Sequence, residues 1–224
     1  MRRSAVGAPV EAHDLQVVAY DAHDETMNGN IGTVYVQEMM PAGNTDDPFL
    51  PCPLLDDRSA RVCGISTFRT LYSPLAYRPR PGDLVDVSGG TYDEFTCSGV
   101  CGSPPQPFPN GLFLPQVRMP TIANSGVAPL SPPIHVTLAD LAAHNAALIG
   151  ALVEVDDVTA VAAPDARGEI ALTTARSGPM ITQEMTAIPG VVAGTRWAHV
   201  VGVVSYFYSP KLIPRSLGDL TPGR

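Results

Sequence analysis

The sequence has few charged residues, and few of these are basic. Charged side chains make up 16% of the 224 residues, with 14 Lys and Arg against 22 Asp and Glu, and the formal net charge is −8. Nucleic-acid-binding surfaces need clustered Lys and Arg to neutralise phosphates. The basic runs Arg2-Arg3 and Arg78-Pro79-Arg80 contain only two Arg each. The charge therefore opposes non-specific nucleic-acid binding.

Long apolar runs are also missing. No run approaches the roughly 18 residues that a membrane-spanning helix needs, so the sequence predicts no membrane span. Arg2 and Arg3 resemble the basic start of a signal peptide, but no apolar segment follows them. Either the protein is cytosolic or this chain is a trimmed form of an exported one.

Proline and glycine, by contrast, are abundant. A chain that is 45% hydrophobic contains 23 Pro and 20 Gly, so it can bury a core but is interrupted by many turns. Long helices are not expected in such a sequence.

Four cysteines, Cys52, Cys63, Cys97 and Cys101, lie in the first half of the chain. An even number in Pro- and Gly-rich sequence favours disulfides in an oxidising compartment, and the low lysine content agrees with export. Local pairing would join Cys52 to Cys63 and Cys97 to Cys101, and the other two connectivities stay open. A four-thiolate zinc site is the alternative. The three-residue gap between Cys97 and Cys101 does not fit a thioredoxin-like redox motif.

Short runs rich in β-branched and aromatic residues indicate strands in both halves. In the first half they span 15–20, 33–38, 64–72, 82–89 and 111–122, where Gly89-Gly90 is expected to break the fourth strand, and a Pro-rich insertion occupies 40–63. In the second half they span 151–164, 169–174, 179–185 and 197–208. The sequence therefore predicts two β domains.

One helix is predicted, and it opens the second half. Thr137 is its N-cap, Asp140 lies at the third following position, and Gly150 ends an alanine-rich interior. Residues 123–136, rich in proline and small residues, are the predicted linker.

Four segments, GTVYVQE, RPGDLVDVSGGTYDEF, IGALVEVDDVTAV and HVVGVVSYFYSPKLIPRSLGDL, resemble the tandem OB-fold-like repeats of exported bacterial surface-lipoprotein and secreted-nuclease-associated proteins. The resemblance extends from about residue 10 to residue 221. It implies a mainly β fold with two small OB-fold-like barrels in tandem: residues 8–122 with the insertion, the linker 123–136, and residues 137–222 with the helix. It supplies no catalytic residues, and the insertion and the cysteines depart from the repeat.

Aromatic residues are candidates for a binding face, because OB folds bind ligands through stacked rings. The candidates are Tyr92, Phe95, Trp197, Tyr206 and Tyr208. The alternative is that these rings close the barrel cores. Strict alternation would place Trp197 and His199 on one face of their strand, where His199 is interpreted as a packed or rim histidine.

Acidic residues near the first predicted strand suggest a cation site. Asp21, Asp24 and Glu25 could offer oxygen ligands to calcium, although EF-hand spacing is absent and a solvated acidic turn is the alternative. A metal-dependent hydrolase would also need His13 and His23 to converge on Asp21 and Asp24.

The sequence thus favours a non-catalytic binding or assembly module of an exported bacterial protein, located in the periplasm, on the outer surface or outside the cell. Its partner would be a surface protein, an oligosaccharide or another copy of the chain. The second hypothesis is an accessory domain of a secreted nuclease or phosphoesterase that binds single-stranded nucleic acid. No G-x-S-x-G motif occurs. No cofactor is predicted, with calcium at the acidic residues as the alternative.

Overall fold

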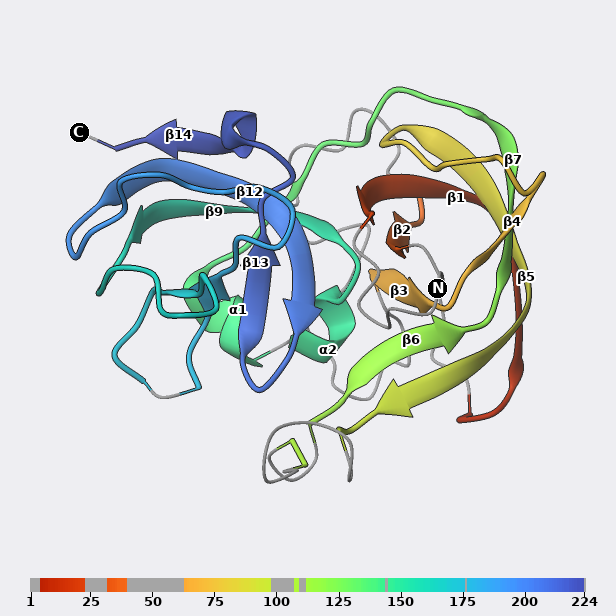
Figure 1. The fold of residues 1–224 in the computed structure, drawn as a ribbon, viewed down its shortest axis with the longest axis horizontal. Coiled ribbons are helices and arrows are strands. Elements are labelled where there is room, and N and C mark those ends of the chain that lie inside the picture. Colours follow the sequence, from red (N-terminus) through yellow and green to blue (C-terminus); the bar gives the residue numbers. More distant parts are fainter. Residues whose placement is uncertain are drawn as a thin grey trace.

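The structure, a computed structural model, consists of two β-sheets that lie side by side (Figure 1). It describes residues 5–22, 32–39, 63–97, 107–108, 112–143, 145–175 and 177–223. Strands dominate these residues, which confirms the predicted mainly β class. The described helices are all short, and none is long and apolar enough to cross a membrane.

The first sheet contains a closed five-stranded barrel. Its strands are β1 (Pro9–Asp21), β2 (Thr33–Gln37), β3 (Gly64–Phe68), β4 (Leu71–Ser73), β5 (Asp83–Phe95), β6 (Leu114–Arg118) and β7 (Thr121–Val127). The barrel runs β1-β2-β3-β6-β5 and closes because β5 also pairs with β1. β3 and β6 are parallel, and β7 and β4 extend the sheet beyond β5. This half has the predicted form of a small OB-fold-like barrel.

Closure depends on bends in the long strand β1. The pairing of β1 with β5 shifts register between Val10 and Ala12 and again between Ala12 and Leu15. Asp14, inside the second shift, has a φ of 52°. Such bulges bend a strand and increase its twist, so β1 pairs with β5 along its first part and with β2 along its second part.

The second sheet repeats this strand order but is open. Its strands are β8 (Ile134–His135), β9 (Leu152–Thr159), β10 (Ile170–Ala171), β11 (Met180–Ile181), β12 (Arg196–Tyr206), β13 (Pro210–Ile213) and β14 (Leu220–Pro222). The order is β10-β11-β13-β12-β9-β8, with β11 and β13 parallel and β14 paired to β12. Just beyond β9, the Val161 N–H donates to the Ala171 carbonyl of β10 (2.9 Å), but β9 and β10 form no ladder. The second half is therefore not the closed barrel that the sequence predicted.

The predicted helix is present as two short segments, α1 (Leu138–Ala143) and α2 (Asn145–Leu148), and a 3-10 turn, η1 (Leu217–Asp219), precedes β14. Thr137 and Asp140 form the predicted capping box. The Thr137 N–H and hydroxyl both donate to Asp140 Oδ2 (2.8 and 2.7 Å), and the Asp140 N–H donates to Thr137 Oγ1 (3.1 Å). Gly150 follows with a φ of 80°, which suits the end of a helix.

The connection between the sheets is shorter than predicted. β7 continues to Val127 by pairing with β5, and β8 already pairs with β9 at Ile134. Only residues 128–133 remain between the sheets, compared with the predicted linker 123–136. Residues 123–127, which the sequence assigned to the linker, belong to β7 because they pair with β5.

The two halves meet in a junction that is both apolar and polar. Side chains from both halves form its apolar part: Val18, Ala19, Tyr35, Leu152, Val203 and Ile213. Two fully buried glutamines of the first barrel provide hydrogen bonds. Gln16 Nε2 donates to the Pro129 carbonyl (2.8 Å) and Gln16 Oε1 accepts from the Ser131 N–H (2.7 Å). Gln37 Oε1 accepts from the Leu152 N–H (3.0 Å). Buried and hydrogen-bonded groups of this kind fix one relative arrangement of the halves.

Candidate functional site

A cleft of about 350 Å³ lies between the two sheets. β2, β3 and β6 of the first barrel form one wall, and β11, β12, β13 and the loop before β10 form the other. Its lining residues are Thr33, Tyr35, Ser66, Thr67, Phe68, Leu114, Gln116, Arg167, Glu169, Thr182, Glu184, Ser205, Tyr206, Phe207 and Lys211. The cleft therefore exists only when both halves are folded and packed together.

Lys211, on β13, carries a buried positive charge in this cleft. It is the only lysine of the chain, and its side chain is 5% exposed. Its ammonium group donates to Glu169 Oε1, lies 3.8 Å from Glu184 Oε1, and stands 5.4 Å from the ring centre of Phe207. A buried charge needs such partners to offset lost hydration, so these residues hold the ammonium group in one place.

Neutral polar groups line much of the remaining surface. Several are already oriented by hydrogen bonds. The Ser66 hydroxyl donates to the Pro115 carbonyl (3.2 Å), the Thr182 hydroxyl to Glu184 Oε1 (3.3 Å), and Gln116 Nε2 to Asp93 Oδ2 (3.0 Å). Groups fixed in this way are preorganised to exchange hydrogen bonds with a polar ligand.

Phe207 is the most exposed aromatic residue of the cleft. It is 36% exposed, whereas the neighbouring Tyr206 is 2% exposed. The Phe207 ring packs edge-on against Phe108 (5.7 Å between centroids) and Tyr208 (5.1 Å). These contacts hold the ring while leaving part of it open.

Tyr206 has a different role. Its hydroxyl is buried and has no hydrogen-bond partner among the described residues. Burial raises the pKa of this phenol, which keeps it neutral at physiological pH. Tyr206 therefore contributes an apolar ring to the core behind the cleft wall.

The other predicted aromatic residues mostly serve the cores as well. Tyr92 and Trp197 are buried in the core clusters of the first and second sheets, and Phe95 and Tyr208 are partly buried against the latter. Phe108, which the sequence did not single out, contacts Phe95, Tyr206 and Tyr208 edge-to-face at 5.0 to 5.9 Å. Of the five predicted residues, Tyr206 alone lines the cleft, so they do not gather on one open face.

The predicted calcium ligands are only partly described. Asp21 is buried at the end of β1 and borders a second cavity with Arg80 and Arg215. Asp24 and Glu25 lie outside the described residues, as does His23, so the calcium site stays a prediction.

His13 is exposed on β1, with its Nδ1 3.3 Å from Asp86 Oδ1 on β5. The described part of the structure therefore pairs His13 with Asp86 and does not bring it to Asp21.

Among the described cysteines, Cys63 and Cys97 are buried and disulfide-bonded, and neither is a free thiol. Cys52 and Cys101 lie outside the described residues. The pairing of the four cysteines therefore stays a prediction. A four-thiolate zinc site would need Cys63 and Cys97 as free thiolates, so their bonded state contradicts that alternative.

The prediction that Trp197 and His199 share a face is wrong. Trp197 is buried and His199 is exposed, and the register between β12 and β14 shifts between these two residues. A bulge breaks the two-residue alternation on which that prediction depended.

His199 Nδ1 instead lies 2.8 Å from Asp156 Oδ1 on β9. This hydrogen bond raises the pKa of His199 above 6.5, against the opposing effect of desolvation.

Sequence reasoning missed Lys211, Glu169, Glu184 and Gln116 as cleft residues. Their positions come from four separate segments, and no local spacing connects them. One signal was present: a single lysine placed directly before the apolar Leu212 and Ile213. No family model, curated protein or solved structure matches this chain.

Proposed function

We propose that the protein is a non-catalytic binding module that takes an uncharged oligosaccharide in the cleft between its two sheets. The observation that carries this proposal is the composition of the cleft: hydroxyl and amide groups, a partly exposed phenylalanine, and charges of both signs in equal number. This proposal selects one of the partners that the sequence left open.

Charge balance supports an uncharged ligand. Arg167 and Lys211 are the cations of the cleft, and Glu169 and Glu184 are its anions. Lys211 is already paired with the two glutamates. A phosphate backbone would meet no surplus of positive charge here, and the chain as a whole carries −8. Both facts oppose the nucleic-acid alternative.

The position of the cleft also supports the proposal. OB folds bind oligosaccharides and oligonucleotides on the face formed by their second and third strands. In the first barrel, β2 and β3 contribute Thr33, Tyr35, Ser66, Thr67 and Phe68 to the cleft. A sugar chain offers hydroxyls to such polar side chains and an apolar ring face to an aromatic residue such as Phe207.

Export belongs to this proposal. The disulfide-bonded state of Cys63 and Cys97 supports an oxidising compartment, in which extracellular or cell-wall glycans would be accessible. The producing cells can be fractionated, and the fraction that contains the protein identified with an antibody. We expect the protein outside the cytoplasm. Recovery of the protein only from the reduced cytosol, with free thiols, would contradict it.

The test is an NMR titration of the isotope-labelled protein with a panel of neutral hexasaccharides: maltohexaose, cellohexaose, chitohexaose and xylohexaose. We expect at least one of them to shift amide signals of β2, β3, β12 and β13. Gln116→Ala and Phe207→Ala should each weaken its binding about tenfold, since each removes one direct contact worth about 1.4 kcal/mol. Leu75→Ala, at an exposed position (82%) outside the cleft, is the matched control.

A single-stranded DNA oligonucleotide tests the second hypothesis in the same experiment. We expect no shifts even at low salt, where phosphate contacts are strongest. DNA binding to the cleft, or sugar binding that Gln116→Ala and Phe207→Ala both leave unchanged, would overturn the proposal.

A further inference from the structure

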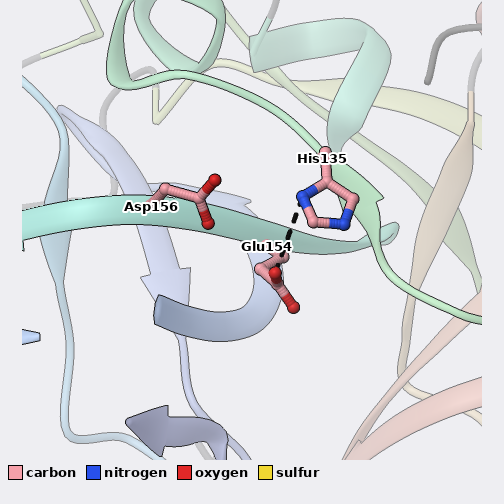
Figure 2. A group of neighbouring side chains, drawn as sticks. All are labelled: His135, Glu154 and Asp156. Atoms are coloured by element: carbon pink, nitrogen blue, oxygen red, sulfur yellow. Dashed lines mark ion pairs between the residues drawn. The ribbon is translucent and has the colours of Figure 1, made fainter. Parts of the chain in front are cut away.

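Two histidines and two carboxylates converge on the outer surface of the second sheet, away from the cleft. His135 lies on β8, Glu154 and Asp156 on β9, and His199 on β12. The strand register brings them together, because His135 is the partner of Glu154 and His199 is the partner of Asp156. Figure 2 shows His135, Glu154 and Asp156 gathered beside β9. None of the four lines the cleft.

The alternation of β9 presents both carboxylates on one side. Glu154 and Asp156 are separated by one residue, Val155, which points into the core and is buried. Residues two apart on a strand share a face. The exposed face of the sheet therefore carries two adjacent carboxylates with an imidazole on either side.

The distances between donor atoms suit a small metal ion. One ligand atom from each of His135, Glu154 and Asp156 lies within 4.8 Å of the others. His135 Nδ1 is 3.5 Å and His199 Nδ1 is 3.6 Å from the same Glu154 Oε1. Bonds of about 2.0–2.2 Å at tetrahedral angles place neighbouring ligands of zinc about 3.4 Å apart. The distances from Glu154 Oε1 to the two imidazole nitrogens are therefore close to the distance between two ligands of one zinc ion.

The charges in this cluster also favour a bound cation. Within the described residues, the ion-pair partners of Glu154 and Asp156 are all histidines, and no Lys or Arg pairs with either carboxylate. Two carboxylates side by side repel each other. A divalent cation would neutralise both and would use the imidazole nitrogens as well.

The donor set distinguishes between classes of metal. Calcium and magnesium take oxygen ligands almost exclusively. A set with two imidazole nitrogens and two carboxylates suits zinc and other divalent first-row transition metals. The cluster is therefore different in kind from the calcium site that the sequence suggested at Asp21, Asp24 and Glu25.

We propose that His135, Glu154 and Asp156, whose ligand atoms form one group, bind one divalent transition-metal ion, of which Zn²⁺ is the representative. His199, beside Glu154 and Asp156, turns toward the ion as its fourth ligand. Bound there, the ion joins β8, β9 and β12, and so fixes the start of the second half against its central strands. The site is independent of the oligosaccharide proposal.

The test uses the whole protein after removal of metals with a chelator. Titration calorimetry with ZnCl₂ is expected to give one Zn²⁺ per chain at this cluster, and an excess of CaCl₂ is expected not to compete with Zn²⁺ for it. A single ion that binds only the folded state also raises the unfolding temperature. Replacement of Zn²⁺ by Co²⁺ should produce visible absorption bands typical of a tetrahedral or five-coordinate site.

Variants locate the ion. His135→Ala, His199→Ala and Glu154→Gln should each weaken Zn²⁺ binding at least tenfold and remove the Co²⁺ bands. All three change a side chain at the surface, so circular dichroism should show the unaltered fold. His13→Ala is the matched control, because His13 is also an exposed histidine beside an aspartate, Asp86, but has no second histidine among the described residues near it. Unchanged binding in the His135→Ala and His199→Ala variants, or no Zn²⁺ binding by the original protein, would overturn the proposal.

Discussion

At the level of single residues, Lys211 shows how the cleft wall is held. Its ammonium group is buried, pairs with Glu169 and lies near Glu184. The Glu169 side chain is itself 14% exposed. In such surroundings the attraction between the charges and the loss of their hydration are both large. The two residues are therefore coupled, and the energetic effect of changing one depends on the other.

This coupling leads to a prediction for Lys211→Met. The variant leaves Glu169 with a poorly solvated and unpaired charge, so we expect the free energy of unfolding to fall by about 3 kcal/mol. Urea denaturation followed by circular dichroism measures the loss. The double variant Lys211→Met, Glu169→Met should recover most of it, because the poorly solvated charge of Glu169 is then removed as well and the remaining Glu184 side chain is 35% exposed to water. A double variant that is as unstable as the single one would contradict this explanation.

At the level of secondary-structure elements, two glycines control the approach of the helix end to the first barrel. Gly64 begins β3, and Gly150 follows α2. A Cβ on Gly64 would overlap the Gly150 carbonyl carbon, and a Cβ on Gly150 would overlap the main-chain nitrogen of Ile65. The main chains of the two halves touch here. A side chain on either residue would push β3 away from the second half.

We therefore expect Gly150→Ala to destabilise the protein by at least about 3 kcal/mol, because it adds a clash with Ile65 to the strain of a positive φ. Gly190→Ala is the matched control. Gly190 has a similar φ of 73°, against 80° for Gly150, but nothing lies within 4 Å of the place that a Cβ on Gly190 would take. For Gly190→Ala we expect the free energy of unfolding to fall by about 1 kcal/mol, because only backbone strain is added. Chemical denaturation of the two variants measures the difference in their stability. Equal destabilisation would show that the clash with Ile65 contributes nothing.

Much of the element order could be predicted from the sequence. Alternation and β-branched content located most strands, and the Thr137–Asp140 pair with Gly150 located the helix. These signals are local, so each can be interpreted within a few residues. The early start of β8 is a tertiary effect that leaves no such signal.

The cleft and the histidine cluster could not be predicted in this way. The cleft brings β2 and β3 together with β13, more than a hundred residues later. His135 and His199 approach one another only through their pairing with β9. The bulge at Trp197 also reversed the face of His199 relative to simple alternation. In each case the decisive information is a pairing between distant strands.

At the level of the whole molecule, buried tyrosines determine how stability depends on high pH. Tyr72 and Tyr77 lie edge-to-face in the first barrel (6.3 Å between centroids). Burial raises the pKa of Tyr72, Tyr77 and Tyr206 above the ordinary value of 10.0. In the case of Tyr77, the nearby Asp83, which accepts a hydrogen bond from the phenol (2.6 Å), raises the pKa further, while the hydrogen bond from Asn124 opposes it.

The sign of the effect follows from proton linkage. Above pH 10 these phenols lose their protons in the unfolded chain but keep them in the folded one, so the folded state binds more protons and stability falls as pH rises. Below pH 10 the phenols are protonated in both states and contribute no slope. We expect the free energy of unfolding, measured in urea at several pH values, to decline more steeply above about pH 10. The variant Tyr72→Phe, Tyr77→Phe should show a smaller decline, and an identical decline would contradict the assignment.

The position of the only lysine has a consequence for proteolysis. A protease that cuts after lysine has one bond to cleave in the entire chain, between Lys211 and Leu212. That bond lies in the middle of β13, where all four residues are buried, and β13 pairs with β11 on one side and β12 on the other. Cleavage requires β13 to leave both neighbours. The rate of that single cut therefore measures how often the second sheet opens, while the first barrel contributes no cleavable bond.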